Sequence, residues 1–110
     1  MSKSKPVTML VRYHPKKGKE KELLSLVEKH WPLLDKVGLV TKEPVRIWKA
    51  SDKRSGDVHF VEMFQWKDGE ASGVAHQTPE VMAIWEPMGE VLEKLELASI
   101  EAIAPKVGKD

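Results

Sequence analysis

The chain has 110 residues, of which 41% are hydrophobic, and this composition suits one globular domain and excludes a disordered chain. Its 18 Lys and Arg are scattered among 17 Asp and Glu, so no basic stripe predicts a nucleic-acid partner, and the absence of cysteine excludes disulfides and thiolate zinc sites. No apolar run is long enough for a membrane span and no apolar segment follows the basic N-terminus, so we expect a cytoplasmic protein without a membrane partner.

The N-terminal half predicts a strand followed by a long helix. Residues 7–14 are rich in β-branched and aromatic side chains, which favours a strand after a polar tail at residues 1–6. Residues 19–38 repeat apolar side chains at helical spacing, with Lys and Glu opposite them. Pro32 lies inside this pattern and predicts a kink near His30, because proline cannot donate its backbone hydrogen bond.

Two further strands are expected at residues 45–50 and 58–66, joined by a hairpin loop of turn formers. Alternation divides the second of these strands into two faces, of which one carries Phe60, Glu62, Phe64 and Trp66 and the other His59, Val61, Met63 and Gln65. Both faces are partly apolar, so the pattern leaves open which one meets the helices.

The C-terminal half predicts a short helical piece at residues 70–77 and then a helix from Pro79 through Leu95. Thr78 suits its N-cap, and Pro87 and Gly89 should bend it. A last strand is expected over residues 95–104, before a tail at 105–110. The predicted order is a strand-helix-strand unit repeated twice.

This order favours an α+β protein with the ferredoxin-like split β-α-β fold, in which two helices cover one face of a four-stranded sheet. We expect a single domain over residues 7–104, flanked by disordered tails. The opposite sheet face would then stay uncovered. Packing this face against the same face of a second copy would bury it, so the sequence predicts a homodimer.

Two stretches carry a resemblance to a known family. The segment KKGKEKELLSLVEKHW and the later segment EMFQWKDGEASGVAHQTPEV resemble the antibiotic biosynthesis monooxygenase family of the dimeric α/β barrel superfamily, and the likeness spans residues 7–103. The resemblance implies a barrel made by the sheets of two subunits, with a ligand pocket in each subunit between sheet and helices. It also implies either oxygenation of electron-rich aromatic compounds without a cofactor or degradation of haem, although many members have no assigned activity.

Two positions argue against the haem-degrading branch. The resemblance places that branch's iron-ligating histidine at Trp85 and its pocket asparagine at Val11. Neither residue keeps the expected chemistry, so we expect no haem and no other cofactor.

Trp66 and His76 match pocket positions of the family. Trp66 would stack on a planar substrate, and His76 would accept a proton from a phenol and so favour its reaction with oxygen. Alternatively, Trp66 is a core aromatic residue and His76 opens a helix and bonds its backbone. Trp31 and Trp85 fall on apolar helical stripes, where they would form either pocket wall or core.

Glu62 and Arg12 lie on strands expected to be neighbours. A structural ion pair between them is the favoured interpretation, and a role for Glu62 as a base is the alternative. The four histidines show no HxH, HxxxH or HExxH spacing, so we expect no metal site. Phosphate-loop and GxSxG motifs are also missing from the sequence.

Two functions therefore remain. One is a homodimeric, cofactor-independent monooxygenase that acts on a small aromatic or quinol-type substrate, with His76 as the base. The other is a non-catalytic protein of the same fold that binds a small apolar or aromatic ligand. The sequence leaves open whether the protein is an enzyme.

Overall fold

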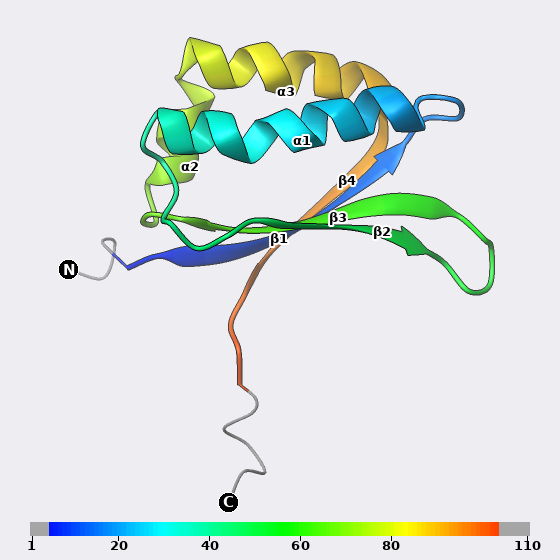
Figure 1. The fold of residues 1–110 in the computed structure, drawn as a ribbon, viewed down its shortest axis with the longest axis horizontal. Helices are drawn as coiled ribbons and strands as arrows, with labels where there is room; N and C mark the ends of the chain where they lie inside the picture. Colours follow the sequence, from blue (N-terminus) through cyan, green and yellow to red (C-terminus); the bar gives the residue numbers. More distant parts are fainter. Residues whose placement is uncertain (1–4, 104–110) are drawn as a thin grey trace, which may run out of the picture.

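The computed structural model describes residues 5–103, so the expected tails at 1–6 and 105–110 lie almost wholly outside the described residues. The described chain forms one four-stranded antiparallel sheet with its helices on one face (Figure 1). Its elements follow in the order β1 (Val7–Pro15), α1 (Glu20–Lys36), β2 (Arg46–Ser51), β3 (Val58–Trp66), α2 (Ala71–His76), α3 (Pro79–Val91) and β4 (Leu92–Ile100).

The sheet has the strand order β2-β3-β1-β4. The hairpin pairs β2 with β3, and β1 lies between β3 and β4, antiparallel to both. This order requires the two crossovers that carry the helices, and it confirms the predicted ferredoxin-like fold.

The C-terminal half has the short helix and the longer helix from Pro79 that the sequence predicted, but the longer one ends earlier than expected. Helix α3 ends at Val91 and does not reach Leu95. Leu92 already has the extended backbone angles φ −93° and ψ 130°, and β4 pairs with β1 from there onward. The apolar spacing of residues 92–95 is compatible with a helix as well as a strand. The backbone hydrogen bonds to β1 stabilise the strand.

The core lies between the helices and the face of β3 that carries Phe60, Glu62, Phe64 and Trp66. Helix α1 contributes Leu23, Val27 and Leu34, all fully buried. The alternation of β3 therefore brings the Glu62 side chain into the core, where none of its surface is exposed.

The opposite sheet face has no helix of the described chain over it (Figure 1). On that face Leu10 lies between Met63 and Ala98 across the strands. Trp48, on β2, is also on this side, because its cross-strand partner is Val61. The face is thus partly apolar, as the sequence predicted.

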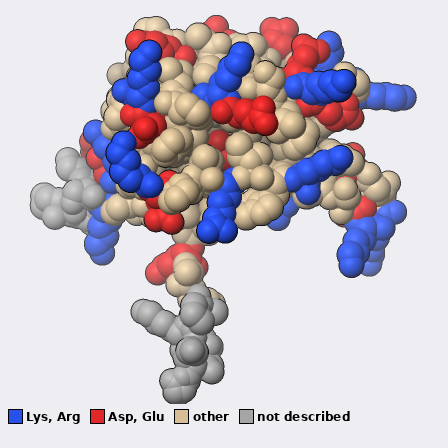
Figure 2. Space-filling view, viewed as in Figure 1, with Lys and Arg blue, Asp and Glu red and all other residues tan. Residues whose placement is uncertain are grey.

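Seen from the side, with the helices above the sheet, the surface shows acidic and basic side chains interspersed, without a continuous patch of one sign in this view (Figure 2). Among residues 5–103, no helix combines the length and the apolar composition that a membrane crossing requires.

Candidate functional site

A cavity of about 260 Å³ lies between the sheet and the helices. Its wall is mostly apolar and aromatic, with a few polar side chains among the lining residues. The lining residues are Met9, Val11, Tyr13, His30, Phe64, Trp66, Ser72, His76, Trp85, Met88, Gly89, Leu92, Leu95 and Leu97. An apolar pocket with a few converging polar groups is the usual form of a small-molecule site.

A buried hydrogen-bond network supports one side of this cavity. The Tyr13 hydroxyl donates to Glu62 Oε1 at 2.6 Å, and His30 Nδ1 lies 3.1 Å from both carboxylate oxygens. The indole Nε1–H of Trp85 donates to His30 Nε2 at 2.8 Å. Because an indole nitrogen can only donate, His30 accepts at Nε2 and carries its proton on Nδ1, which donates to Glu62.

Every polar side chain of this network therefore has a partner, which is what a buried polar cluster needs to be stable. Burial raises the pKa of Tyr13 well above its ordinary value, and the charge of Glu62 and the hydrogen bond to it act in the same direction. Tyr13 thus remains a donor at neutral pH. Both ring nitrogens of His30 are already engaged, so His30 fixes the Trp85 ring in the cavity wall and has no lone pair to offer a ligand.

His76 differs from His30 in this respect. It ends α2 and is exposed, and its ring meets the Trp85 ring edge-on at a centroid distance of 4.8 Å. Its Nδ1–H donates to the Ser72 carbonyl at 2.9 Å. The lone pair of Nε2 has no hydrogen-bond donor among the described side chains, so this nitrogen can accept a proton from a ligand in the cavity.

The structure thus brings three of the predicted site residues, Trp66, His76 and Trp85, to one cavity. The bond from His76 to its own helix backbone, which was the alternative interpretation, is also present. Trp31 does not line this cavity. It packs half-buried against the core, and its buried Nε1–H has no partner among residues 5–103.

Sequence reasoning missed Tyr13 and His30. The signal for His30 was available, since it continues the buried stripe of Leu23, Val27 and Leu34 at helical spacing. A histidine in a core stripe and a glutamate among aromatic residues each need a buried polar partner, and they could have been matched to one another.

The predicted ion pair between Arg12 and Glu62 is wrong. Glu62 lies opposite Val11 across the β1–β3 ladder, and Arg12 lies opposite Val61. Because adjacent residues of a strand point to opposite faces, Arg12 is on the uncovered face, where its guanidinium donates to His59 Nε2 at 3.0 Å.

Val11 and Trp85, the two positions that argued against haem, both line the cavity. Trp85 has no lone pair with which to ligate iron, and its N–H is committed to His30.

These features define an α+β ferredoxin-like protein with an apolar, aromatic-walled cavity under its helices. Comparison of the sequence with family models and with curated proteins gives no match. Solved structures, however, resemble the chain over nearly its whole length.

One of these structures is SnoaB, a cofactor-independent oxygenase from Streptomyces nogalater, which is 15% identical, with a TM-score of 0.65 over 92% of this chain and 98% of SnoaB. Another is an antibiotic biosynthesis monooxygenase, 13% identical, with a TM-score of 0.66 over 88% of this chain and 98% of its own. A third is a dimeric protein of unknown function with a ferredoxin-like fold from Bacteroides fragilis, 13% identical, with a TM-score of 0.67 over 88% and 96% of the two chains. The resemblance to antibiotic biosynthesis monooxygenases is therefore confirmed for the fold.

Proposed function

We propose that the protein is a homodimeric, cofactor-independent monooxygenase that acts on a small aromatic or quinol-type substrate, with His76 as the general base. The observation that carries this proposal is the pairing of an aromatic-walled cavity with one imidazole nitrogen free to accept a proton. Proteins of the same fold include a cofactor-independent oxygenase, which supports the reaction class.

The cavity suits a compact, planar ligand. Its volume of about 260 Å³ lies just below the range of roughly 300 to 1,000 Å³ typical of drug-sized ligands, so it would hold a compound of one or two rings. Trp66 and Phe64 stand edge to face at 5.0 Å and offer an aromatic surface on the sheet side. Leu95 and Leu97, which are 46% and 64% exposed, extend the apolar lining along β4.

The chemistry follows from the free nitrogen of His76. A quinol hydroxyl would transfer its proton to Nε2, and the resulting phenolate is electron-rich enough to react with dioxygen at a ring carbon. The imidazolium would return the proton to the peroxide that forms, and loss of water would leave a hydroxylated quinone. Quinol and dioxygen thus give hydroxyquinone and water, so dioxygen is the only oxidant needed and the general base supplies the acceleration.

The uncovered sheet face supports the homodimer. Leu10, Met63 and Ala98 lie together there, and Trp48 and Ile100 are 44% and 38% exposed. Packing this face on a second copy would bury it, and one protein of similar fold is described as dimeric.

Oxygen uptake with a panel of quinols and polyphenols, on chelator-treated protein, tests the reaction. His76→Ala should lower uptake by about a hundredfold or more, the scale of general-base catalysis, without unfolding the protein, because His76 is exposed. Gln77→Ala is the matched control, since Gln77 is the next residue and does not line the cavity. Equal uptake by the His76 variant would remove it as the base, and absence of uptake with every substrate would leave the non-catalytic ligand-binding protein as the better account.

A further inference from the structure

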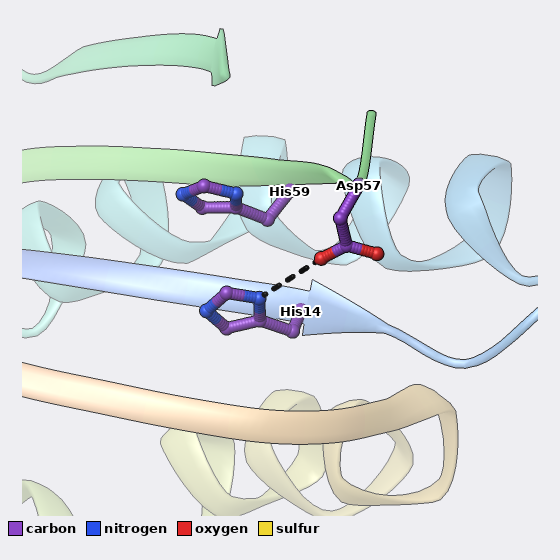
Figure 3. A group of neighbouring side chains, drawn as sticks. All are labelled: His14, Asp57 and His59. Carbon is purple, nitrogen blue, oxygen red and sulfur yellow. Dashed lines mark ion pairs between the residues drawn. The ribbon is translucent and has the colours of Figure 1, made fainter. Parts of the chain in front are cut away.

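We propose that His14, Asp57 and His59 form a binding site for a divalent transition-metal ion, at the hairpin end of the sheet and on the face opposite to the cavity. His14 ends the regular part of β1, His59 lies at the start of β3, and Asp57 closes the hairpin loop just before it. Figure 3 shows the carboxylate turned toward the two imidazole rings.

The three side chains are already gathered. One possible ligand atom from each lies within 4.8 Å of the other two, and His14 Nδ1 is 3.7 Å from Asp57 Oδ2. The two imidazole rings stack at a centroid distance of 4.5 Å. Ligand atoms around a tetrahedral zinc ion are about 3.3 Å apart, so the cluster must contract by roughly 1.5 Å at most. Asp57 can supply part of this movement, since its side chain is 65% exposed and belongs to a loop.

His59 provides an independent sign of a missing ligand. It is only 9% exposed, and its buried Nδ1 has no hydrogen-bond partner within the described part of the chain. Buried polar atoms are nearly always satisfied, so an unpartnered one needs an explanation. A metal ion bound between the rings and the carboxylate would satisfy it.

His14 has the outer-shell partner that a metal-binding histidine usually has. Its Nε2 lies 2.8 Å from Glu96 Oε1, so with Nδ1 bound to the ion the Nε2–H would donate to a carboxylate.

Arg12 opposes binding in the present arrangement. Its guanidinium donates to His59 Nε2, which places the His59 proton on Nδ1. Metal binding at Nδ1 would move that proton to Nε2, and Arg12 would have to turn away. Glu96 lies directly opposite Arg12 on β4, so its carboxylate could pair with the Arg12 guanidinium after that movement.

Two imidazoles and one carboxylate favour zinc, cobalt, nickel or copper over magnesium and calcium, which prefer oxygen ligands alone. A three-residue set leaves a further coordination position for water. His14 and Asp57 also border an open surface groove, through which the ion could enter. The ion would then clamp the β2–β3 hairpin loop to the end of β1.

Calorimetric titration of the tag-free, chelator-treated full chain with Zn²⁺ tests the proposal, with the visible spectrum of Co²⁺ as a second readout. We expect one ion per chain and a micromolar or tighter dissociation constant. Asp57→Asn and His14→Ala should each weaken binding at least tenfold, whereas His76→Ala, a histidine outside the cluster, should not change it. Asp57→Asn keeps the loop intact, because Asp57 makes its hydrogen bonds within the loop through its backbone.

Arg12→Gln tests most directly whether the metal ion binds His59 through Nδ1. A glutamine oxygen can accept the Nε2–H of metal-bound His59, so this variant should bind Zn²⁺ more tightly, by about tenfold, the lower end of outer-shell effects. Weaker or equal binding by Arg12→Gln would contradict the assigned geometry. Failure to saturate below millimolar Zn²⁺, or unchanged binding after loss of both His14 and Asp57, would overturn the site.

Discussion

Two polar clusters lie on opposite faces of the same sheet, and they differ in how completely their hydrogen bonds are made. Under the helices, Glu62, Tyr13, His30 and Trp85 satisfy one another. On the uncovered face, His59 leaves a buried nitrogen unpartnered within the described chain, and the Asp57 carboxylate is solvated and 3.7 Å from His14. The Glu62 cluster therefore stabilises the fold, whereas the His59 cluster has a polar atom, unpaired among the described residues, with which to bind a ligand.

The comparison teaches that burial of a titratable group does not by itself mark a reactive site. Glu62 is the most buried carboxylate of the described chain, yet its oxygens are occupied by two donors. The imidazole with a lone pair available to a ligand in the cavity is that of the exposed His76, whose ring contacts the Trp85 ring in the same cavity wall.

The largest expected effect is the loss of the buried carboxylate. Glu62→Ala leaves the Tyr13 hydroxyl and the His30 Nδ1–H without an acceptor, at about 1–3 kcal/mol for each, so the free energy of unfolding should fall by roughly 2–6 kcal/mol. Urea unfolding measures this change. Glu86→Ala, an exposed position of α3, should stay within about 0.5 kcal/mol. A loss from Glu62→Ala no larger than that of the control would contradict the buried network.

The next effect depends on pH. The pKa of Tyr13 is raised in the folded protein, so its stabilising contribution is complete below the ordinary tyrosine pKa of about 10 and is lost as the pH rises toward the folded value. In that window the unfolded state binds fewer protons, and the free energy of unfolding should fall by about 1.4 kcal/mol per pH unit from this group. Tyr13→Phe should remove this part of the slope. Parallel slopes for the two proteins, measured by urea unfolding between pH 9 and pH 11, would show that Tyr13 titrates normally.

The smallest effect is expected on the other face. Asp57→Asn removes an exposed carboxylate that makes only a long ion pair, so in the presence of a chelator the free energy of unfolding should change by less than about 0.5 kcal/mol. Thermal unfolding with and without Zn²⁺ sharpens the contrast, because the ion should stabilise wild type more than the variant at the same Zn²⁺ concentration. A large fall in the free energy of unfolding of Asp57→Asn without metal would mean that Asp57 belongs to a structural network like that of Glu62.

The fold was accessible from the sequence because its signals are local. The period-2 pattern of residues 58–66 and the helical stripe of residues 23–34 each contain enough information to place an element. The segment from Leu92 to Leu95 is ambiguous by spacing, and only its pairing with β1 makes it a strand. That pairing joins residues about eighty positions apart, so no pattern within the segment itself could have predicted it.

The cavity was partly predictable for the same reason. Trp66 and His76 come from a resemblance that fixes positions along the chain, and Trp85 comes from an apolar helical stripe. All three reach the cavity. The partners of Glu62 required knowing which face of β3 meets the helices, a choice that the two half-apolar faces left open. His14, Asp57 and His59 escape any motif of short spacing, because it is the antiparallel ladder between β1 and β3 that brings them together.

The central claim is that His76, and not His30, has the nitrogen that receives a ligand's proton. Long-range proton–nitrogen NMR spectra of the imidazole rings test it directly, with a redox-inert phenol added to the protein. The account predicts that both rings carry hydrogen on Nδ1 and that the phenol shifts the Nε2 resonance of His76 while that of His30 stays unchanged. A shift of His30 with His76 unaffected would contradict the account and place the ligand-binding nitrogen in the buried network.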